Sequence, residues 1–358
     1  MGIDNIKTIH VTTPITITHD VTVKIIQAQI DHSIPEPAPE RPLFSTIRQG
    51  TATNQLTKLI PKDGRNSIID PINKSATMEA KDLTVFIEKY SEVKLKTSAY
   101  MLLDVLTIVL TESGAKSTIV SLPLNSYMDL RGLKDKKSAR NQIENDLISL
   151  YEISLSFKDD NEKNQNFYDM RMLQGKGIIK NGVITVQFTE PFLALLKRYT
   201  VMAYPVQALQ FNAKYNPHSY FLLRKIAEHK NMNVGKTNED KIRIETLLEA
   251  CPLLPTYDEV MNGDRDIYGR IIDPFFRDMG ALAETIEYSY LHKNNTPITD
   301  EELTSIKYKE FKDLIIQIMW KQYPDQTKRL ERKQANIEKN QKNKTPKRRG
   351  RPPKKQPE

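Results

Sequence analysis

Four polar residues near the middle of the chain have the types and spacing needed to read the edges of nucleic-acid bases. Lys136, Lys137, Arg140 and Asn141 lie toward one face of a predicted helix. In a helix that enters the major groove of DNA, the N-terminal residues lie nearest the base edges, and these four are placed there. Arg140 could offer two parallel donors to guanine, and Asn141 could pair similarly with adenine. The same residues also fit the solvated face of an ordinary helix.

The opposite face of this helix is apolar, so the helix is expected to pack on a core. Its apolar residues recur at helical spacing. They are Ala139, Ile143, Leu147 and Leu150. The polar face is therefore left to solvent or to a ligand.

The elements before this helix can be predicted from their periodicity. Apolar spacing predicts a long helix over 99–110 that ends at Gly114, and a short helix over 82–93 ahead of it. A β-branched strand over 118–122 and a short helix over 127–130 follow. The order helix, strand, helix, helix predicts a helix-turn-helix in which the third helix carries the basic face.

Strands with alternating apolar residues follow the basic helix and predict a β-wing. They cover 151–157, 167–172 and 183–188, with a hairpin tip over 159–166. The tip is acidic and poorly suited to phosphate. The better wing contacts are Arg171, Lys176 and Lys180.

A weaker copy of the same order is predicted in the second half of the chain. Helices are expected over 217–230, 244–250 and 256–261, and strands over 286–290 and 314–320. The predicted third helix of this copy spans 265–283 and should be kinked at Pro274. Its candidate DNA contacts are Arg265, Arg270 and Arg277.

The end of the chain carries a short basic motif that resembles an AT-hook. Such a motif lays an extended Gly-Arg-Pro core along a narrow A·T-rich minor groove, where negative potential favours inserted arginine. By that resemblance Arg349 and Arg351 enter the groove. A nonspecific basic tail or a localisation-like patch is the alternative. The motif consists of Arg348, Arg349, Gly350, Arg351 and Pro352.

The net charge of +8 is concentrated in the tail. Residues 326–358 contain 13 Lys/Arg and 3 acids, which leaves 40 Lys/Arg against 42 acids in the remaining chain. Any nucleic-acid face on the folded body must therefore be local.

Several classes of protein and site are not supported. A single cysteine, Cys251, excludes an intramolecular disulfide and suits a reducing cytoplasm. The longest apolar run, near 101–110, is too short to span a membrane, and no signal peptide is evident. No zinc-ligand spacing, nuclease-like acidic cluster or complete phosphate-binding loop is found. We therefore expect a protein that is not an enzyme and has no metal or cofactor.

These patterns predict an α+β fold with two tandem winged-helix domains and flexible N- and C-terminal tails. The expected segments are a flexible leader with a Pro-rich linker over 1–76, domain 1 over 77–200, domain 2 over 201–325 and the basic tail over 326–358. The Thr/Ile/Val-rich start of the leader could instead form a hairpin arm.

The tandem order resembles the plasmid replication initiator (Rep) family. The resemblance rests on two segments, 138–157 and 216–275, and covers about residues 80–322. It implies binding to repeated origin sequences, a dimer that represses and a monomer that initiates, and recruitment of a host helicase or its loader. The long leader and the AT-hook-like tail depart from that family, so a phage or an integrated mobile element is an alternative source.

The functional prediction is a sequence-specific, double-stranded DNA-binding replication initiator in a bacterial cytoplasm. A transcriptional regulator or architectural protein without a replication role is the first alternative. The second is an interaction protein whose folded body binds protein and whose tail binds nucleic acid nonspecifically.

Overall fold

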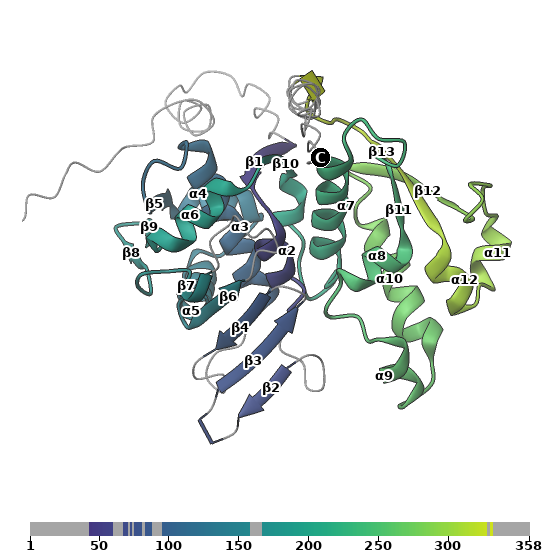
Figure 1. Cartoon of the computed structure of the whole chain (residues 1–358), viewed down its shortest axis with the longest axis horizontal. Coiled ribbons are helices and arrows are strands. Elements are labelled where there is room, and N and C mark those ends of the chain that lie inside the picture. The colour runs from purple at the N-terminus through teal and green to yellow at the C-terminus, as the bar shows by residue number, and fades with distance from the viewer. Residues whose placement is uncertain are drawn as a thin grey trace, which may run out of the picture. The chain divides into compact units, whose positions relative to one another are not determined.

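The computed structural model describes residues 43–59, 67–70, 72–73, 75–80, 83–87, 95–157, 167–327 and 330–331. The fold is mixed α/β, and the chain divides into two compact units, each described separately below (Figure 1). Unit 1 contains the described residues between Asp63 and Thr200. Unit 2 contains those of Leu43–Lys62 together with those that follow Val201. Unit 1 is thus inserted between two parts of unit 2.

The prediction of a flexible leader over 1–76 is wrong for the described residues from 43 onward. Strand β1 (Phe44–Arg48) and helix α2 (Thr51–Leu56) belong to unit 2, while strands β2 (Ser67–Asp70) and β3 (Ser75–Ala80) belong to unit 1. These elements are too short to show a clear period in the sequence. They nevertheless bury apolar side chains, including Ile47, Ala52, Leu56 and Met78. The first 42 residues lie outside the described part of the chain.

Unit 1 is built around helix α3 (Thr97–Glu112), which is buried on nearly every side. Strand β5 (Ile119–Pro123), helix α4 (Leu124–Arg131) and helix α5 (Lys136–Tyr151) follow, in the order predicted from the sequence. Gly132 ends α4 in the left-handed region, at φ 64°, which favours glycine. Helix α6 (Glu190–Arg198) closes the unit.

A three-stranded antiparallel sheet with the order β5-β9-β8 accompanies these helices. Strands β8 (Ile178–Lys180) and β9 (Val183–Gln187) form a hairpin. Its two turn residues, Asn181 and Gly182, both have positive φ (52° and 75°), as a two-residue hairpin turn requires. The first strand of this sheet, β5, pairs with the last strand, β9.

The strands on either side of the predicted hairpin tip over 159–166 are not part of this sheet. Strands β6 (Ile153–Phe157) and β7 (Phe167–Arg171) belong to a separate five-stranded sheet with the order β2-β3-β4-β6-β7. Strand β4 (Leu83–Ile87) occupies the place of the helix predicted over 82–93, because alternate residues of the strand are buried. The predicted acidic tip itself, over 159–166, lies outside the described residues.

Unit 2 contains the helices α7 (Ser219–Asn233), α8 (Ile244–Glu249), α9 (Tyr257–Met261), α10 (Asp273–Gly280), α11 (Asp300–Thr304) and α12 (Tyr308–Asp313). Its three-stranded sheet has the order β11-β13-β12. These strands are β11 (Lys241–Arg243), β12 (Ile286–Leu291) and β13 (Ile315–Trp320). A separate pair joins β1 to β10 (Val201–Pro205), followed by a 3₁₀ turn over Val206–Leu209.

The third helix of unit 2 is shorter than the predicted 265–283 and is not α-helical throughout. A π-helical segment, Tyr268–Ile272, leads into α10, and Pro274 lies in the first turn of α10. Proline has no amide hydrogen to donate, and its ring collides with the carbonyl four residues earlier. A wider π turn before Pro274 accommodates both effects without ending the helix.

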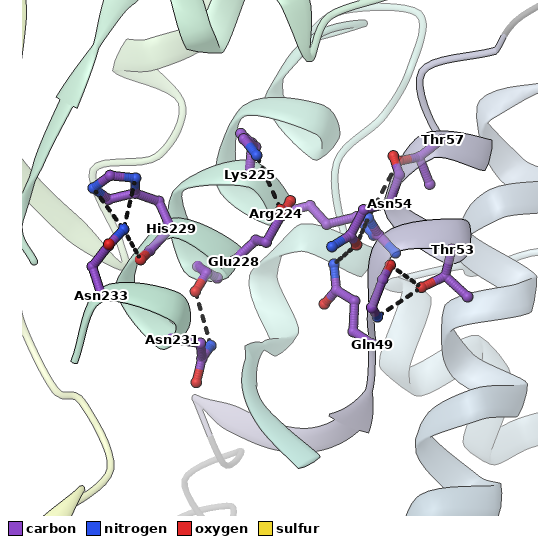
Figure 2. A network of polar contacts seen from close by, with 12 residues as sticks. Gln49, Thr53, Asn54, Thr57, Arg224, Lys225, Glu228, His229, Asn231 and Asn233 are labelled. Carbon is purple, nitrogen blue, oxygen red and sulfur yellow. Dashed lines mark hydrogen bonds and ion pairs between the residues drawn. The ribbon is translucent and has the colours of Figure 1, made fainter. Parts of the chain in front are cut away.

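A buried guanidinium ties the segment at 49–57 to α7. Arg224 has only 4% of its surface exposed, and its Nη1 atom donates to Asn54 Oδ1 at 3.1 Å and to Thr57 Oγ1 at 3.2 Å. Figure 2 shows Asn54, Thr57 and Gln49 gathered around Arg224. Because an unpaired buried charge is costly, residues 43–59 are a structural part of unit 2.

Candidate nucleic-acid interface

The N-terminal half of α5 presents a basic and amide-bearing face to solvent. Lys136, Lys137 and Asn141 are exposed, whereas Ala139 and Ile143 are buried as predicted. The N-cap residue is Asp135, and its carboxylate accepts a hydrogen bond from the backbone amide of Ser138 at 2.8 Å. This bond fixes the start of the helix.

The outward ridge of α5 also includes a residue that the sequence analysis missed. Residues four apart lie on one face of a helix, so Lys137, Asn141 and Asn145 follow one another along it, and all three are exposed. Asn145 has the same pairing chemistry as Asn141. Extending the basic face by one more helical turn would have found it. We call these three residues the α5 ridge.

Arg140 is placed differently from the other predicted contacts. Its Nε atom pairs with Glu144 Oε1 at 3.0 Å, and its Nη2 atom donates to the carbonyl oxygen of Ile179 at 3.2 Å. The side chain therefore lies between α5 and strand β8. Two of its nitrogen atoms, Nε and Nη2, are thus directed at the chain's own acceptors.

Of the three predicted wing contacts, only Lys180 stands at the hairpin tip. It is exposed and directly precedes the turn between β8 and β9. Arg171 and Lys176 instead lie over the ring of Tyr151, at 5.1 and 5.9 Å from its centroid. Lys180 is consequently the hairpin residue best placed to meet a phosphate.

A buried polar cluster lies beneath the helices of unit 1. Asp146 of α5 is 3% exposed and accepts a hydrogen bond from Ser98 Oγ at 2.8 Å. Burial raises the pKa of this carboxyl to about 6, against the opposing effects of the Ser98 hydrogen bond and the nearby charges of Arg131 and Lys96. Tyr127, also buried here, has its pKa raised by the same desolvation.

Unit 1 should therefore lose stability as the pH rises from about 4 to 7. The folded state holds the Asp146 proton more tightly than the unfolded chain, so the stabilising contribution is full below the ordinary pKa near 3.8 and is lost as the pH passes about 6. Asp146→Asn keeps an acceptor for Ser98 but cannot ionise. The free energy of unfolding of this variant, relative to that of wild type, should rise by roughly 2–3 kcal/mol between pH 4 and pH 7.

Hydrogen exchange of the slowest amides of α3, measured from pH 4 to pH 7, gives the free energy of unfolding of unit 1. Ser98→Ala is the control, because it removes the hydrogen bond and leaves the ionisable carboxyl. If the stability difference between wild type and Asp146→Asn is the same at pH 4 and pH 7, Asp146 does not ionise in the folded unit with a raised pKa.

The arginines predicted for unit 2 do not form a comparable ridge. Arg265 is exposed in the loop before the π segment, at φ 61°. Arg270 pairs with Asp264 at 3.2 Å, and Arg277 pairs with Asp278 Oδ1 at 2.9 Å. Two of the three positive charges are thus compensated within the unit.

Asp278 explains the position of Arg277. This carboxylate is fully buried, and its Oδ2 atom accepts from the backbone amide of His218 at 2.6 Å, at the N-terminus of α7. Ser219 Oγ donates to the Asp278 carbonyl at 2.9 Å. Burial lowers the pKa of His218 to about 4, so its ring is neutral near pH 7. Arg277 therefore balances a buried charge that joins α10 to α7.

Some predicted features fall outside the part of the chain that the structure describes. All five residues of the AT-hook-like motif, Arg348 to Pro352, do so. Among the described residues, no group of three or more His, Cys, Asp or Glu side chains is arranged to hold a metal ion. No helix in the same ranges has both the length and the apolar composition needed to cross a membrane.

Comparisons with known proteins found matches only among solved structures. No protein-family model matches the chain, and no curated protein matches it. A structure of domains 2 and 3 of RctB, in a selenomethionine form, is similar with 11% identity and a TM-score of 0.37, covering 75% of this chain and 98% of that one. A second structure of RctB domains 2–3 is similar with 12% identity and a TM-score of 0.32, covering 60% and 82%. TM-scores below 0.5 do not establish a shared fold.

Proposed function

We propose that this chain binds double-stranded DNA in a sequence-specific manner through two winged-helix units and acts as a replication initiator. The observation that carries the proposal is a common order of elements in both units. In unit 1 the order is α3, β5, α4, α5, β8, β9, with β6 and β7 inserted between α5 and β8. In unit 2 it is α7, β11, α8, the π segment with α10, β12 and β13, with α9 inserted after α8 and with α11 and α12 inserted between β12 and β13.

The strand pairing supports the winged-helix interpretation. In unit 1 the strand that follows α3, β5, pairs with the last strand, β9, which also pairs with the strand before it, β8. In unit 2 the strand that follows α7, β11, pairs with the last strand, β13, which also pairs with the strand before it, β12. That pairing attaches a hairpin to a three-helix arrangement, which is the plan of a helix-turn-helix with a wing. Figure 1 labels β5, β8 and β9 close together in unit 1, and β11, β12 and β13 close together in unit 2.

The two units would contribute to DNA binding in different ways. In unit 1 the α5 ridge would face base edges in the major groove, with Lys136 and Lys180 on phosphates. In unit 2 Arg265 is exposed, whereas Arg270 and Arg277 are held in ion pairs. We therefore assign base reading to unit 1 and phosphate contacts to Arg265 and, through the exposed part of its side chain, Arg270.

The basic tail would add affinity for A·T-rich DNA. Arg349 and Arg351 are proposed to enter the minor groove around Gly350 and Pro352, with Arg348 on a phosphate. An initiator also needs partners, which we propose to be the host replicative helicase or its loader, and a second copy of the chain. The protein would act in the cytoplasm without enzymatic activity, metal or cofactor of its own.

The initiator role is tested by asking whether the gene and its neighbouring repeats support replication of a plasmid that lacks an origin. We expect replication with wild type and none with the variant Lys137→Ala/Asn141→Ala. If the protein binds the repeats and represses a reporter gene, yet no plasmid is maintained, it is a transcriptional regulator. If it binds no fragment selectively, the DNA-reading proposal fails as well.

A further inference from the structure

We infer that Arg140 is a positioning residue that fastens the β8–β9 hairpin to α5, and not a residue that contacts a DNA base. The inference deepens the proposed function, because it determines which basic residues of unit 1 face DNA. It begins from the two bonds of the guanidinium, to Glu144 on the same helix and to the carbonyl oxygen of Ile179 on β8.

The geometry of Arg140 directs it along α5 toward the hairpin. Glu144 lies one turn further along α5 and accepts from Nε at 3.0 Å, which holds the guanidinium close to the helix surface. The Nη2 atom then reaches the Ile179 carbonyl at 3.2 Å, across 39 residues of chain. A charged donor on a backbone carbonyl is one of the stronger hydrogen bonds of a protein surface.

The strand that Arg140 contacts has few other means of being held. Strand β8 has three residues and lies at the edge of its sheet, with Ile179 as its one buried residue. Its neighbour Gly177, at φ 71°, approaches α5 so closely that an added Cβ atom would lie 3.0 Å from Leu147 Cδ1. Two contacts therefore join the hairpin segment to α5. Gly177 packs close to the Leu147 side chain, and the Ile179 carbonyl accepts a hydrogen bond from Arg140.

The consequence for DNA binding concerns Lys180. This residue follows Ile179 directly, and its side chain points to the opposite side of the strand, toward solvent. A bond to the Ile179 carbonyl therefore fixes the place from which Lys180 projects. The α5 ridge, in contrast, needs no hairpin for its position, because it is fixed by the helix itself.

The first test needs no DNA and uses the full-length chain. Amide hydrogen exchange of residues 176–187 is compared for wild type, Arg140→Gln and Glu144→Gln. We expect Arg140→Gln to speed exchange in the hairpin by about tenfold, the effect of losing one charge-assisted hydrogen bond. Glu144→Gln removes the ion pair and keeps the bond to Ile179, so it should change exchange by less than about threefold. Helix α3 should exchange at the wild-type rate in both variants.

The second test is a pair of double-mutant cycles on DNA affinity, and it rests on the proposed function. With Arg140→Gln present, Lys180→Gln should cost at least threefold less affinity than it costs in wild type, because Lys180 is no longer fixed. Lys137→Gln should cost the same in both backgrounds, since it does not depend on the hairpin.

The outcomes separate the two claims. Unchanged hairpin exchange in Arg140→Gln overturns the positioning role, whatever the DNA result. A second result also overturns it. If hairpin exchange is faster in Arg140→Gln but Lys180→Gln costs the same DNA affinity with and without Arg140→Gln, the bond from Arg140 does not position Lys180 for DNA binding. If the full chain binds no DNA, the proposed function fails, and the exchange result still decides whether Arg140 holds the hairpin.

Discussion

Asn141→Ala is expected to lower discrimination between the target site and unrelated DNA by roughly ten- to a hundredfold, corresponding to about 1–3 kcal/mol for a bidentate amide–adenine pair. Asn141 is exposed in the middle of the α5 ridge and faces away from Ala139 and Ile143. Its loss removes a base contact without opening a cavity in the core. Nonspecific affinity should stay within about twofold, because that affinity comes from phosphate contacts.

The discrimination ratio is measured by competition binding at one fixed salt concentration. Asn125→Ala is the matched control, because Asn125 is also exposed on a helix of unit 1 but lies on α4, outside the ridge. It should leave the ratio unchanged. A ratio for Asn141→Ala equal to that of wild type would show that Asn141 does not read a base.

Asp278→Ala is expected to reduce the free energy of unfolding of unit 2 by about 3 kcal/mol or more. The fully buried carboxylate accepts from the His218 amide and from Arg277, so its removal leaves a buried donor and a cation without their acceptor. Trp320 is the single tryptophan of the chain and lies in unit 2, so its fluorescence in a urea titration follows this unit alone.

Asp273→Ala serves as the control for this substitution. Asp273 is exposed on the same helix, where the loss of a surface carboxylate usually changes stability by no more than about 0.5 kcal/mol. A loss of less than about 1 kcal/mol for Asp278→Ala would mean that the carboxylate does not hold α7 against α10 in the way described.

The sequence predicted the elements whose patterns are long and local. Helix α5 was expected from four apolar residues at helical spacing, and all four are buried. The helix at 97–112 and the strand at 119–123 were expected from similar patterns and are confirmed. Each of these elements buries one continuous stripe or face, so its period is visible without knowledge of its neighbours.

Elements that depend on distant partners were mispredicted. Leu83, Val85 and Ile87 are buried at alternate positions, yet a five-residue strand within a mixed stretch was interpreted as helix. The segment 43–59 lacks a period because polar residues such as Asn54 and Thr57 are buried against Arg224, some 170 residues away. Pairing over such distances cannot be derived from local periodicity.

The candidate site was predicted in part, for a related reason. The sequence identifies which residues of α5 are polar, but it does not show which of them are bonded within the chain. Arg140 and Arg277 were grouped with free cations, and both are paired with carboxylates. Asn145 lies one helical turn beyond the predicted contacts, which end at Asn141. Which of these residues contact DNA stays a prediction.

We propose that the folded units, and not only the basic tail, read DNA. The most direct measurement compares the full chain with a chain that ends at Glu331, which keeps the described residues and removes eleven Lys/Arg. Both are tested on DNA fragments from around the gene at two salt concentrations. We predict that the shortened chain binds more weakly and with a shallower salt dependence, yet still selects one repeat-containing fragment. If all selective binding disappears with the tail, the winged-helix units do not read sequence, and the assignment of the α5 ridge is contradicted.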